Sequence, residues 1–378
     1  MLARKNILGL VLICVVAIGG CTPAEGGNDG GAGASGMSGG DGDGDGDGDG
    51  DGDGDGDAPI GRCPDPLQQA LVFSPRDLSN GSVIFKIMHD DGMLYFSTVD
   101  RLFRVSALGG EPEELYHRAD AIVVQFWVRE SDILIIEGTN DFVSLSKVGG
   151  ATSPAGEVPF AIAGGLSGSL DLIVVSDDLA YAKSSSHYYE IDLNTFDTRA
   201  IMSEPLGHYS NFVKAGDALY VVDNDPSAPE PTSPTAFVPD LLYRLPIEGT
   251  AAEVVAIDQP PQRMNLVGAR GDSLYILARG EQLRTNLYRV PVTGGAREEV
   301  LFAGYTPATK LVHSENRVFA RDLNEYRELP ETGRAGDSIC IAGSGYTTHS
   351  AAATDTDVWF GLYHSDDEQA FIVRYPVQ

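Results

Sequence analysis

Short apolar runs, separated by turn-forming residues, fill the last three quarters of this chain, and one phrase recurs there seven times. Its fullest copies are Asp91-Gly92-Met93-Leu94-Tyr95 and Gly271-Asp272-Ser273-Leu274-Tyr275. Both of these copies are followed by an apolar run that contains Arg-Val, and then by Gly-Gly. Aligned on Leu94, Leu134, Ala180, Leu219, Leu274, Val318 and Trp359, the copies are 40, 46, 39, 55, 44 and 41 residues apart.

This period is typical of propeller blades, and the pattern inside each repeat agrees with it. The fifth repeat reads as four strands, and apolar residues on both faces of each strand indicate sheets packed between neighbours. We therefore predict an all-β fold, a seven-bladed β-propeller of four-stranded antiparallel blades. The last repeat lacks one strand, and we expect Ala70–Ser74 to supply it and so close the ring.

Aromatic and basic residues recur in step with this period. Because their register follows the blades, we assign the aromatic residues to the core rather than to a carbohydrate-stacking surface. They are Tyr95, Tyr181, Tyr220, Tyr275, Phe319 and Phe360. The arginines of the third strands are interpreted as ion-pair partners between blades or at blade edges. They are Arg104, Arg244, Arg289 and Arg374.

The N-terminus has the features of an export signal. Arg4 and Lys5 precede the apolar run 7–18, which is too short to span a bilayer as a helix. The junction that ends in Cys21 resembles the lipobox of bacterial lipoproteins, which implies cleavage after residue 20 and lipid attachment at Cys21. Several acyl chains would hold the protein firmly in a membrane. Thr22 replaces the Asp of the inner-membrane retention pattern, so the resemblance implies an outer-membrane lipoprotein, facing the periplasm or the cell surface.

Residues 21–62 are predicted to be a disordered tether between this signal (1–20) and a propeller domain at 63–378. Residues 22–57 contain no large apolar residue except Met37, and they end in an Asp-Gly alternation from Asp41 to Asp57. The spacing is similar to the start of an EF-hand loop, but no closing Glu follows. No cofactor is predicted, and calcium on this tether stays a minor alternative to a solvated spacer.

Charge and cysteines narrow the partners and the compartment. The net charge of −29 opposes binding to phosphate backbones, so nucleic acid is not expected as a partner. Cys63 and Cys340 are the two cysteines of the folded part, and an oxidising exported compartment favours a disulfide between them over two free thiols.

The repeats of Leu-Tyr-Arg-Val and Gly-Gly after Asp-Gly-x-Leu-Tyr-Phe resemble those of TolB-type and related bacterial propellers, and they extend over residues 66–378. The resemblance implies a propeller and leaves the function open, because such folds serve as scaffolds, sensors and enzymes. One long step between repeats contains a proline-rich insertion, a candidate ligand-face loop or else a tolerated surface insertion. Its prolines are Pro226, Pro229, Pro231, Pro234 and Pro239.

The sequence gives no catalytic motif. Gly165-Leu166-Ser167-Gly168-Ser169 lacks the last glycine of a nucleophile elbow, and the seven histidines do not repeat in register. We therefore expect a membrane-anchored binding or scaffolding protein of the cell envelope, with a protein or glycan partner. The alternative is a metal-dependent propeller enzyme of the lactonase or lyase type with an axial site, so the sequence leaves catalysis uncertain.

Overall fold

The computed structural model divides into two units, residues 1–57 and 58–378, and everything described below belongs to the second unit. The structure describes residues 71–73, 83–118, 123–137, 141–147, 152–157, 171–174, 178–184, 187–201, 212–225, 227, 239–248, 251–260, 263–279, 285–301, 311–314, 316–322, 325–335, 338–340, 346–364 and 369–377. Within these residues no helix is long and apolar enough to cross a membrane.

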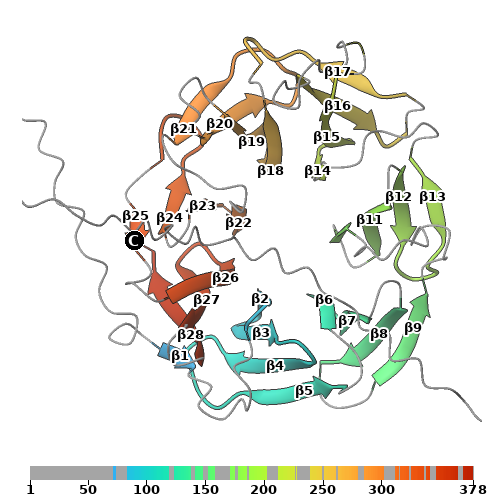
Figure 1. Ribbon diagram of the computed structural model, residues 1–378. Helices are drawn as coiled ribbons and strands as arrows, with labels where there is room; N and C mark the ends of the chain where they lie inside the picture. The colour runs from blue at the N-terminus through green and yellow to red at the C-terminus, as the bar shows by residue number, and fades with distance from the viewer. Residues whose placement is uncertain are drawn as a thin grey trace, which may run out of the picture. The chain divides into compact units, whose positions relative to one another are not determined.

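The described residues form seven four-stranded antiparallel sheets, and the all-β prediction is confirmed (Figure 1). Sheets I to III are β2 (Lys86–Asp90), β3 (Met93–Ser97), β4 (Arg101–Ser106), β5 (Glu113–His117); β6 (Val123–Val128), β7 (Asp132–Glu137), β8 (Asp141–Ser146), β9 (Thr152–Glu157); β10 (Asp171–Val174), β11 (Leu179–Ser184), β12 (His187–Asp192), β13 (Thr198–Ala200). Sheets IV and V are β14 (Phe212–Ala215), β15 (Ala218–Asn224), β16 (Asp240–Pro246), β17 (Glu253–Val255); β18 (Met264–Arg270), β19 (Ser273–Arg279), β20 (Thr285–Pro291), β21 (Glu298–Leu301). Sheets VI and VII are β22 (Leu311–His313), β23 (Val318–Asp322), β24 (Glu325–Leu329), β25 (Ser338–Cys340); β26 (Tyr346–Ala353), β27 (Asp357–His364), β28 (Gln369–Pro376), β1 (Leu71–Phe73).

The first described strand of the chain completes the last sheet. β1 pairs antiparallel with β28, with Leu71 opposite Val373 and Phe73 opposite Ile372, and it lies beside β28 in Figure 1. The prediction that a segment at the start of the domain supplies the missing strand is therefore confirmed. This pairing joins the two ends of the repeat array and covers an edge of sheet VII that would otherwise be open.

Seven apolar clusters hold the sheets together, and each cluster is shared by two sheets that follow one another. Leu94 and Ile372 meet in the cluster between sheets VII and I, and Val318 and Leu277 meet in the one between sheets V and VI. Together the clusters connect the sheets in the order I to VII and then back to I. Each sheet thus buries both faces, which explains why its strands are apolar on both sides.

The pairing register corrects two repeats of the sequence alignment by one residue. Tyr95 is the third residue from the turn end of its strand pair; it lies opposite Arg104 and packs toward the following sheet. The equivalent residues, which also pack toward the following sheet, are Leu134 in sheet II and Trp359 in sheet VII. Phe360, which the sequence alignment puts at this position, packs toward the preceding sheet instead. The error arose because Asp132 and Asp357 are the first residues of β7 and β27 rather than turn residues.

Each sheet has two ends of different character. The loops between its first and second strands and between its third and fourth strands lie at one end, which we call the turn end. The loop between the second and third strands and the link to the next sheet lie at the other, the connection end. Asp91 (φ 45°) and Gly92 (φ 72°) form a tight turn at the turn end of sheet I, as Asp-Gly predicts.

The recurrent Gly-Gly is explained at the turn end of sheet V. Gly294 has φ 85°, and a Cβ atom there would lie 2.3 Å from the carbonyl oxygen of Ala256, in the chain that follows β17 of sheet IV. Gly295 N donates to that same oxygen at 2.8 Å, and Asp258 N donates to Gly295 O at 2.9 Å. The first glycine therefore permits a backbone contact between neighbouring sheets that no side chain would allow.

Candidate functional site

The proline-rich insertion leaves sheet IV between its second and third strands, β15 and β16, at the connection end. Asn224 of β15 pairs with Asp240 of β16, and Asp225 N then donates to Pro239 O at 2.7 Å. Pro239 is the one predicted proline among the described residues; Pro226, Pro229, Pro231 and Pro234 lie outside them. The hairpin is therefore closed by hydrogen bonds up to the base of the insertion.

A local turn directs the chain out of this base. Oδ1 of Asp225 accepts hydrogen bonds from Ser227 N at 2.8 Å and from Ser227 Oγ at 2.7 Å. The hydrogen bonds from the Ser227 side chain and backbone lower the pKa of Asp225. An aspartate that bonds to the residue two positions on is a common way to start a turn, and Asp225 and Ser227 are linked in this way at the base of the insertion.

The other end of the insertion is tied to the next sheet. Oδ2 of Asp240 accepts a hydrogen bond from the backbone N of Met264, the first residue of β18 in sheet V, at 2.7 Å. Burial raises the pKa of Asp240, the Met264 hydrogen bond opposes this, and the nearby carboxylate of Asp223 adds to the rise. Two sheets therefore hold the base of the insertion, and nothing in the residue pattern had indicated the Asp240 contact.

Exposed apolar side chains occur at the same end of sheet I. Phe85 is 51% exposed and precedes β2, while Val99 is 41% exposed and lies between β3 and β4. Phe85 N donates to Ser97 O at 3.0 Å, and Val123 N donates to Val99 O at 2.9 Å, so both residues have hydrogen-bonded backbones. The connection end therefore presents apolar surface on a fixed backbone as well as the base of the insertion.

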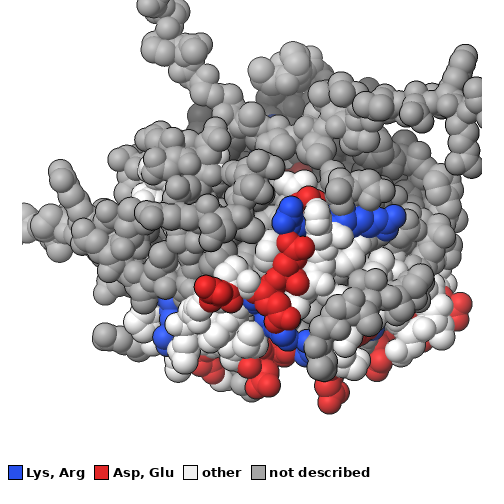
Figure 2. All heavy atoms as spheres, turned by 90° about the horizontal axis from the view of Figure 1, so that it is seen from below, with Lys and Arg blue, Asp and Glu red and all other residues white. Residues whose placement is uncertain are grey.

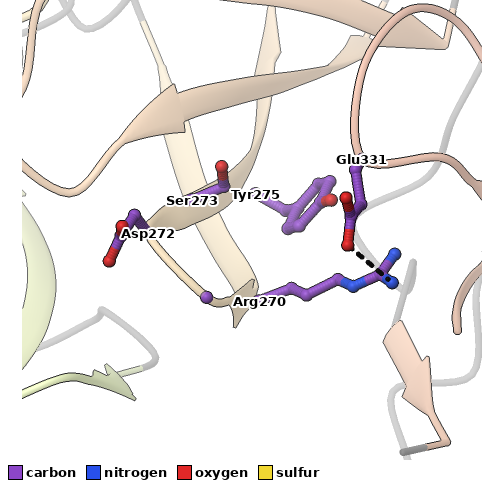
Figure 3. A pocket seen from close by; sticks show the side chains of 6 residues that line it. Arg270, Asp272, Ser273, Tyr275 and Glu331 are labelled. Atoms are coloured by element: carbon purple, nitrogen blue, oxygen red, sulfur yellow. Dashed lines mark hydrogen bonds and ion pairs between the residues drawn. The ribbon is translucent and has the colours of Figure 1, made fainter. Parts of the chain in front are cut away.

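A second candidate is a shallow pocket of about 170 Å³ at the turn end of sheet V (Figure 3). Arg270 crosses it and forms an ion pair with Glu331 at 3.4 Å, while the ring of Tyr275 lies beside the pair and Asp272 points away from it. Arg270 also donates to Leu329 O at 3.4 Å and to Asn316 O. The pocket is smaller than most ligand sites, and its cation is already bonded to three groups.

The repeat shows what this ion pair does. Asp90, the last residue of β2, binds Lys147 of sheet II at 2.7 Å, and Asp90 and Lys147 occupy the same repeat positions as Arg270 and Glu331. The acidic residue belongs to the earlier sheet in the pair Asp90–Lys147, whereas the basic residue belongs to the earlier sheet in the pair Arg270–Glu331. The pocket is therefore part of the contact between sheets V and VI, and we assign it a structural role.

The recurrent arginines are inter-sheet and edge ion-pair partners, as predicted. Arg104 binds Glu113 at 2.5 Å in its own sheet and donates to Lys147 O at 2.7 Å in the next one. Arg289 binds Glu298 at 2.5 Å and donates to Pro330 O at 2.7 Å in sheet VI.

The other two recurrent arginines pair within their own sheets. Arg244 binds Glu253 and Asp217 at 2.9 and 2.8 Å. Arg374 binds Asp357 at 2.6 Å. The described part of the outer surface in Figure 2 accordingly shows acidic and basic side chains side by side, with acidic ones prevailing along its lower margin.

Among the described residues, the histidines do not form a metal site. His89 and His313 occupy equivalent positions on the first strands β2 and β22, whereas His349 lies nearer the start of the first strand β26. Among the residues that the structure describes, no group of three or more His, Cys, Asp or Glu side chains could hold a metal ion. His208 lies outside the described residues.

The cysteine predictions are not tested by the structure. Cys21 and Cys63 lie outside the described residues, and Cys340 is the last residue of β25. Lipid attachment, the tether, calcium on its Asp-Gly repeat and the disulfide therefore stay predictions.

No family model and no curated protein matches this sequence. Solved structures match the fold. A structure described as YCF48 bound to D1 peptide has a TM-score of 0.55 and 12% identity, over 80% of this chain and 95% of that one. PorZ, described as a surface component of the type-IX secretion system of Porphyromonas gingivalis, has a TM-score of 0.52 and 12% identity, over 78% of this chain and 38% of PorZ. Hydrazine synthase of Kuenenia stuttgartiensis has a TM-score of 0.50 and 10% identity, over 78% and 96%.

These matches define the class: the chain contains a β-propeller domain. The chain spans little more than a third of the length of PorZ. At such low identities the likeness concerns the fold alone, and the matched proteins include both a peptide complex and an enzyme.

Proposed function

We propose that this chain is a lipid-anchored protein of the bacterial cell envelope whose propeller is a binding scaffold for a protein or glycan partner. In this proposal Cys21 carries the lipid in the outer membrane, residues 22–62 are the tether, and sheets I to VII are the blades of a seven-bladed, TolB-like propeller. The lipobox-like sequence before Cys21 supports the anchor. Propeller neighbours such as YCF48, which was solved with a bound peptide, support the scaffold role.

We place the partner at the connection end. The observation that carries this placement is the hydrogen bond from Met264 N to Asp240, because it fixes the base of the insertion to two sheets at once. A projecting loop on a rigid base is a frequent way to build a binding surface. Phe85 and Val99 add exposed apolar area at the same end, and apolar anchors often carry the binding energy of an interface.

Site-specific photo-crosslinking tests the placement. A photoreactive phenylalanine analogue at position 85 or 99 of the full-length chain is expected to capture a defined partner from intact envelopes. Position 108 is the matched control, because Leu108 is 79% exposed but lies at the turn end of sheet I. Equal capture from positions 85 and 108, or none from 85 and 99, would contradict the proposal, and the chemistry of the adduct distinguishes protein from glycan.

The insertion can be tested separately. Replacing residues 226–238 by Asn-Gly keeps Asp225, Pro239 and Asp240 and supplies a two-residue hairpin turn. We expect the shortened chain to keep its thermal unfolding midpoint and to lose most of the adduct from position 99. An unchanged adduct would mean that the insertion is a tolerated surface loop.

The anchor is tested by Cys21→Ser. We expect the substituted chain to leave the membrane fraction and to lose incorporation of labelled palmitate. Persistence of both in the Cys21→Ser chain would exclude lipid attachment at this residue without affecting the placement of the partner.

A further inference from the structure

The contact that closes the sheet array contains an aromatic stack with a titratable member. The His89 ring of β2 lies 5.0 Å from the Trp359 ring of β27, and the two planes are inclined by only 9°. Trp359 is 2% exposed, and its Nε1 donates to Ala107 O at 3.2 Å. The stack therefore joins sheet VII, which β1 completes, to sheet I.

Little room exists for rearrangement around this stack. Ser350 Oγ donates to Ile84 O at 3.2 Å across the same two sheets. A Cβ atom on Gly361 would lie 2.6 Å from Ser350 Oγ and 3.1 Å from Ile84 Cγ2. Interiors packed this closely do not deform smoothly, so a change of charge in the stack is not absorbed by small shifts.

Three carboxylates raise the pKa of the His89 imidazole through their charge. Asp90 and Asp91 belong to its own hairpin, and Asp357 belongs to β27. Asp90 is bound to Lys147 at 2.7 Å, and Asp357 is bound to Arg374 at 2.6 Å. Two of the three carboxylates near the imidazole are thus already paired with cations.

The titration of His89 follows from this setting. Burial lowers the pKa of His89 below 6.5, and the carboxylates of Asp90, Asp357 and Asp91 oppose that effect without cancelling it. The unfolded chain therefore takes up this proton at a higher pH than the folded chain does. Stability from His89 is complete above about pH 6.5 and is lost as the pH falls through the folded-state pKa.

We propose that the contact between sheets VII and I is a pH-sensitive seam, and that the stacking of His89 on Trp359 is its sensor. Acidification places a cation in the stack where the array closes on itself, and it loosens that seam. Two hydrogen bonds, from Ser350 Oγ to Ile84 O and from Trp359 Nε1 to Ala107 O, cross between sheets VII and I beside the stack.

Tryptophan fluorescence reads the sensor directly. The chain has 2 tryptophans, so Trp127→Phe leaves Trp359 alone, and a protonated imidazole in contact with an indole quenches its emission. In this background we expect one emission change with a midpoint below pH 6.5. Adding His89→Phe keeps a stacked ring and should abolish the change.

His313→Phe is the matched control, because His313 occupies the same repeat position in β22 and the pKa of His313 is also lowered, by burial first and then by Arg270. We expect the transition to remain in this variant. A transition that survives His89→Phe, or that is absent from the Trp127→Phe chain, would overturn the proposal.

A second measurement does not depend on removing Trp127. In the otherwise unchanged full-length chain, the fall in unfolding midpoint between pH 7.5 and pH 5 should be smaller for His89→Phe than for the native sequence. An equal fall in the native and His89→Phe chains would show that the seam does not sense pH through His89.

Discussion

Glu190 and Arg199 lie directly opposite each other in β12 and β13, and they form the cross-strand ion pair of the repeat with its charges exchanged. In sheet I the third strand provides the arginine and the fourth provides the glutamate, as Arg104 and Glu113. Arg199 nevertheless donates to Ile247 O at 3.2 Å, which is the equivalent of the contact from Arg104 to Lys147 O. The geometry of the link is kept although the charges have changed places.

This exchange predicts the outcome of a charge swap. Glu190→Arg or Arg199→Glu alone places like charges opposite each other and should cost about 1 kcal/mol of unfolding free energy. The double variant restores the polarity of sheet I, and we expect it to recover most of that loss. A double-mutant cycle in denaturant measures the coupling, and additive losses would show that Glu190 and Arg199 do not interact.

Burial separates two arginines that look alike in the sequence. The Arg289 side chain is 7% exposed and bonds to Glu298 and to Pro330 O, whereas the Arg244 side chain is 26% exposed and its partners are mostly solvated. We expect Arg289→Ala to lower the unfolding free energy by about 2–3 kcal/mol, because it removes charge-assisted hydrogen bonds to Glu298 and Pro330 O made by a largely buried side chain. Arg244→Ala should cost no more than about 1 kcal/mol. Chemical denaturation compares them, and equal losses would contradict this ranking.

Two glycines with positive φ distinguish backbone strain from a steric clash. Gly271 has φ 52° and open space around it, so Gly271→Ala should cost only the left-handed conformation, about 1 kcal/mol. Gly294→Ala adds a Cβ atom 2.3 Å from Ala256 O, and we expect it to cost clearly more, about 3 kcal/mol. Thermal unfolding of both variants measures the difference. Similar midpoints would mean that the contact to Ala256 relaxes easily.

The sequence predicted those parts of the fold that depend on local pattern. The strand order inside each repeat, the turn at Asp91-Gly92 and the strand supplied from the domain start all follow from alternation and turn residues. The register of sheets II and VII was missed because Asp132 and Asp357 look like turn aspartates when read in isolation.

The pattern of apolar and polar residues did not predict the contacts between repeats. Asp240 bonds to Met264 N, and His89 stacks on Trp359, across sheets that no local signal connects. Such contacts depend on which side chains the twist of each sheet brings together. The position of the insertion was predictable from the repeat spacing, but the way in which its base is held was not.

The contribution of one carboxylate, Asp132, to stability in acid can be tested. Burial would raise the pKa of Asp132, but hydrogen bonds from Arg129 at 2.7 Å and from Ser144 outweigh it and lower the pKa below 3.8. A depressed folded-state pKa means that this group stabilises the protein above about pH 4, and that the contribution is lost as the pH falls through the folded-state pKa. Asp132→Asn should therefore lower the unfolding free energy at pH 7. The difference in unfolding free energy between the variant and the native sequence should be smaller at pH 3. A constant gap in denaturant midpoints across this range would contradict the assignment.

The disulfide between Cys63 and Cys340 can be tested by thiol chemistry. We expect the exported chain to show no thiol that reacts with maleimide until a reductant is added, because Cys14 would be removed with the signal and Cys21 would carry lipid. A bridge of this span closes a loop of about 277 residues, so reduction should lower the unfolding free energy by up to roughly 5 kcal/mol. Cys63→Ser and Cys340→Ser should each reproduce the reduced midpoint, and neither should respond further to reductant. Two reactive thiols in the unreduced native chain would rule out the bridge.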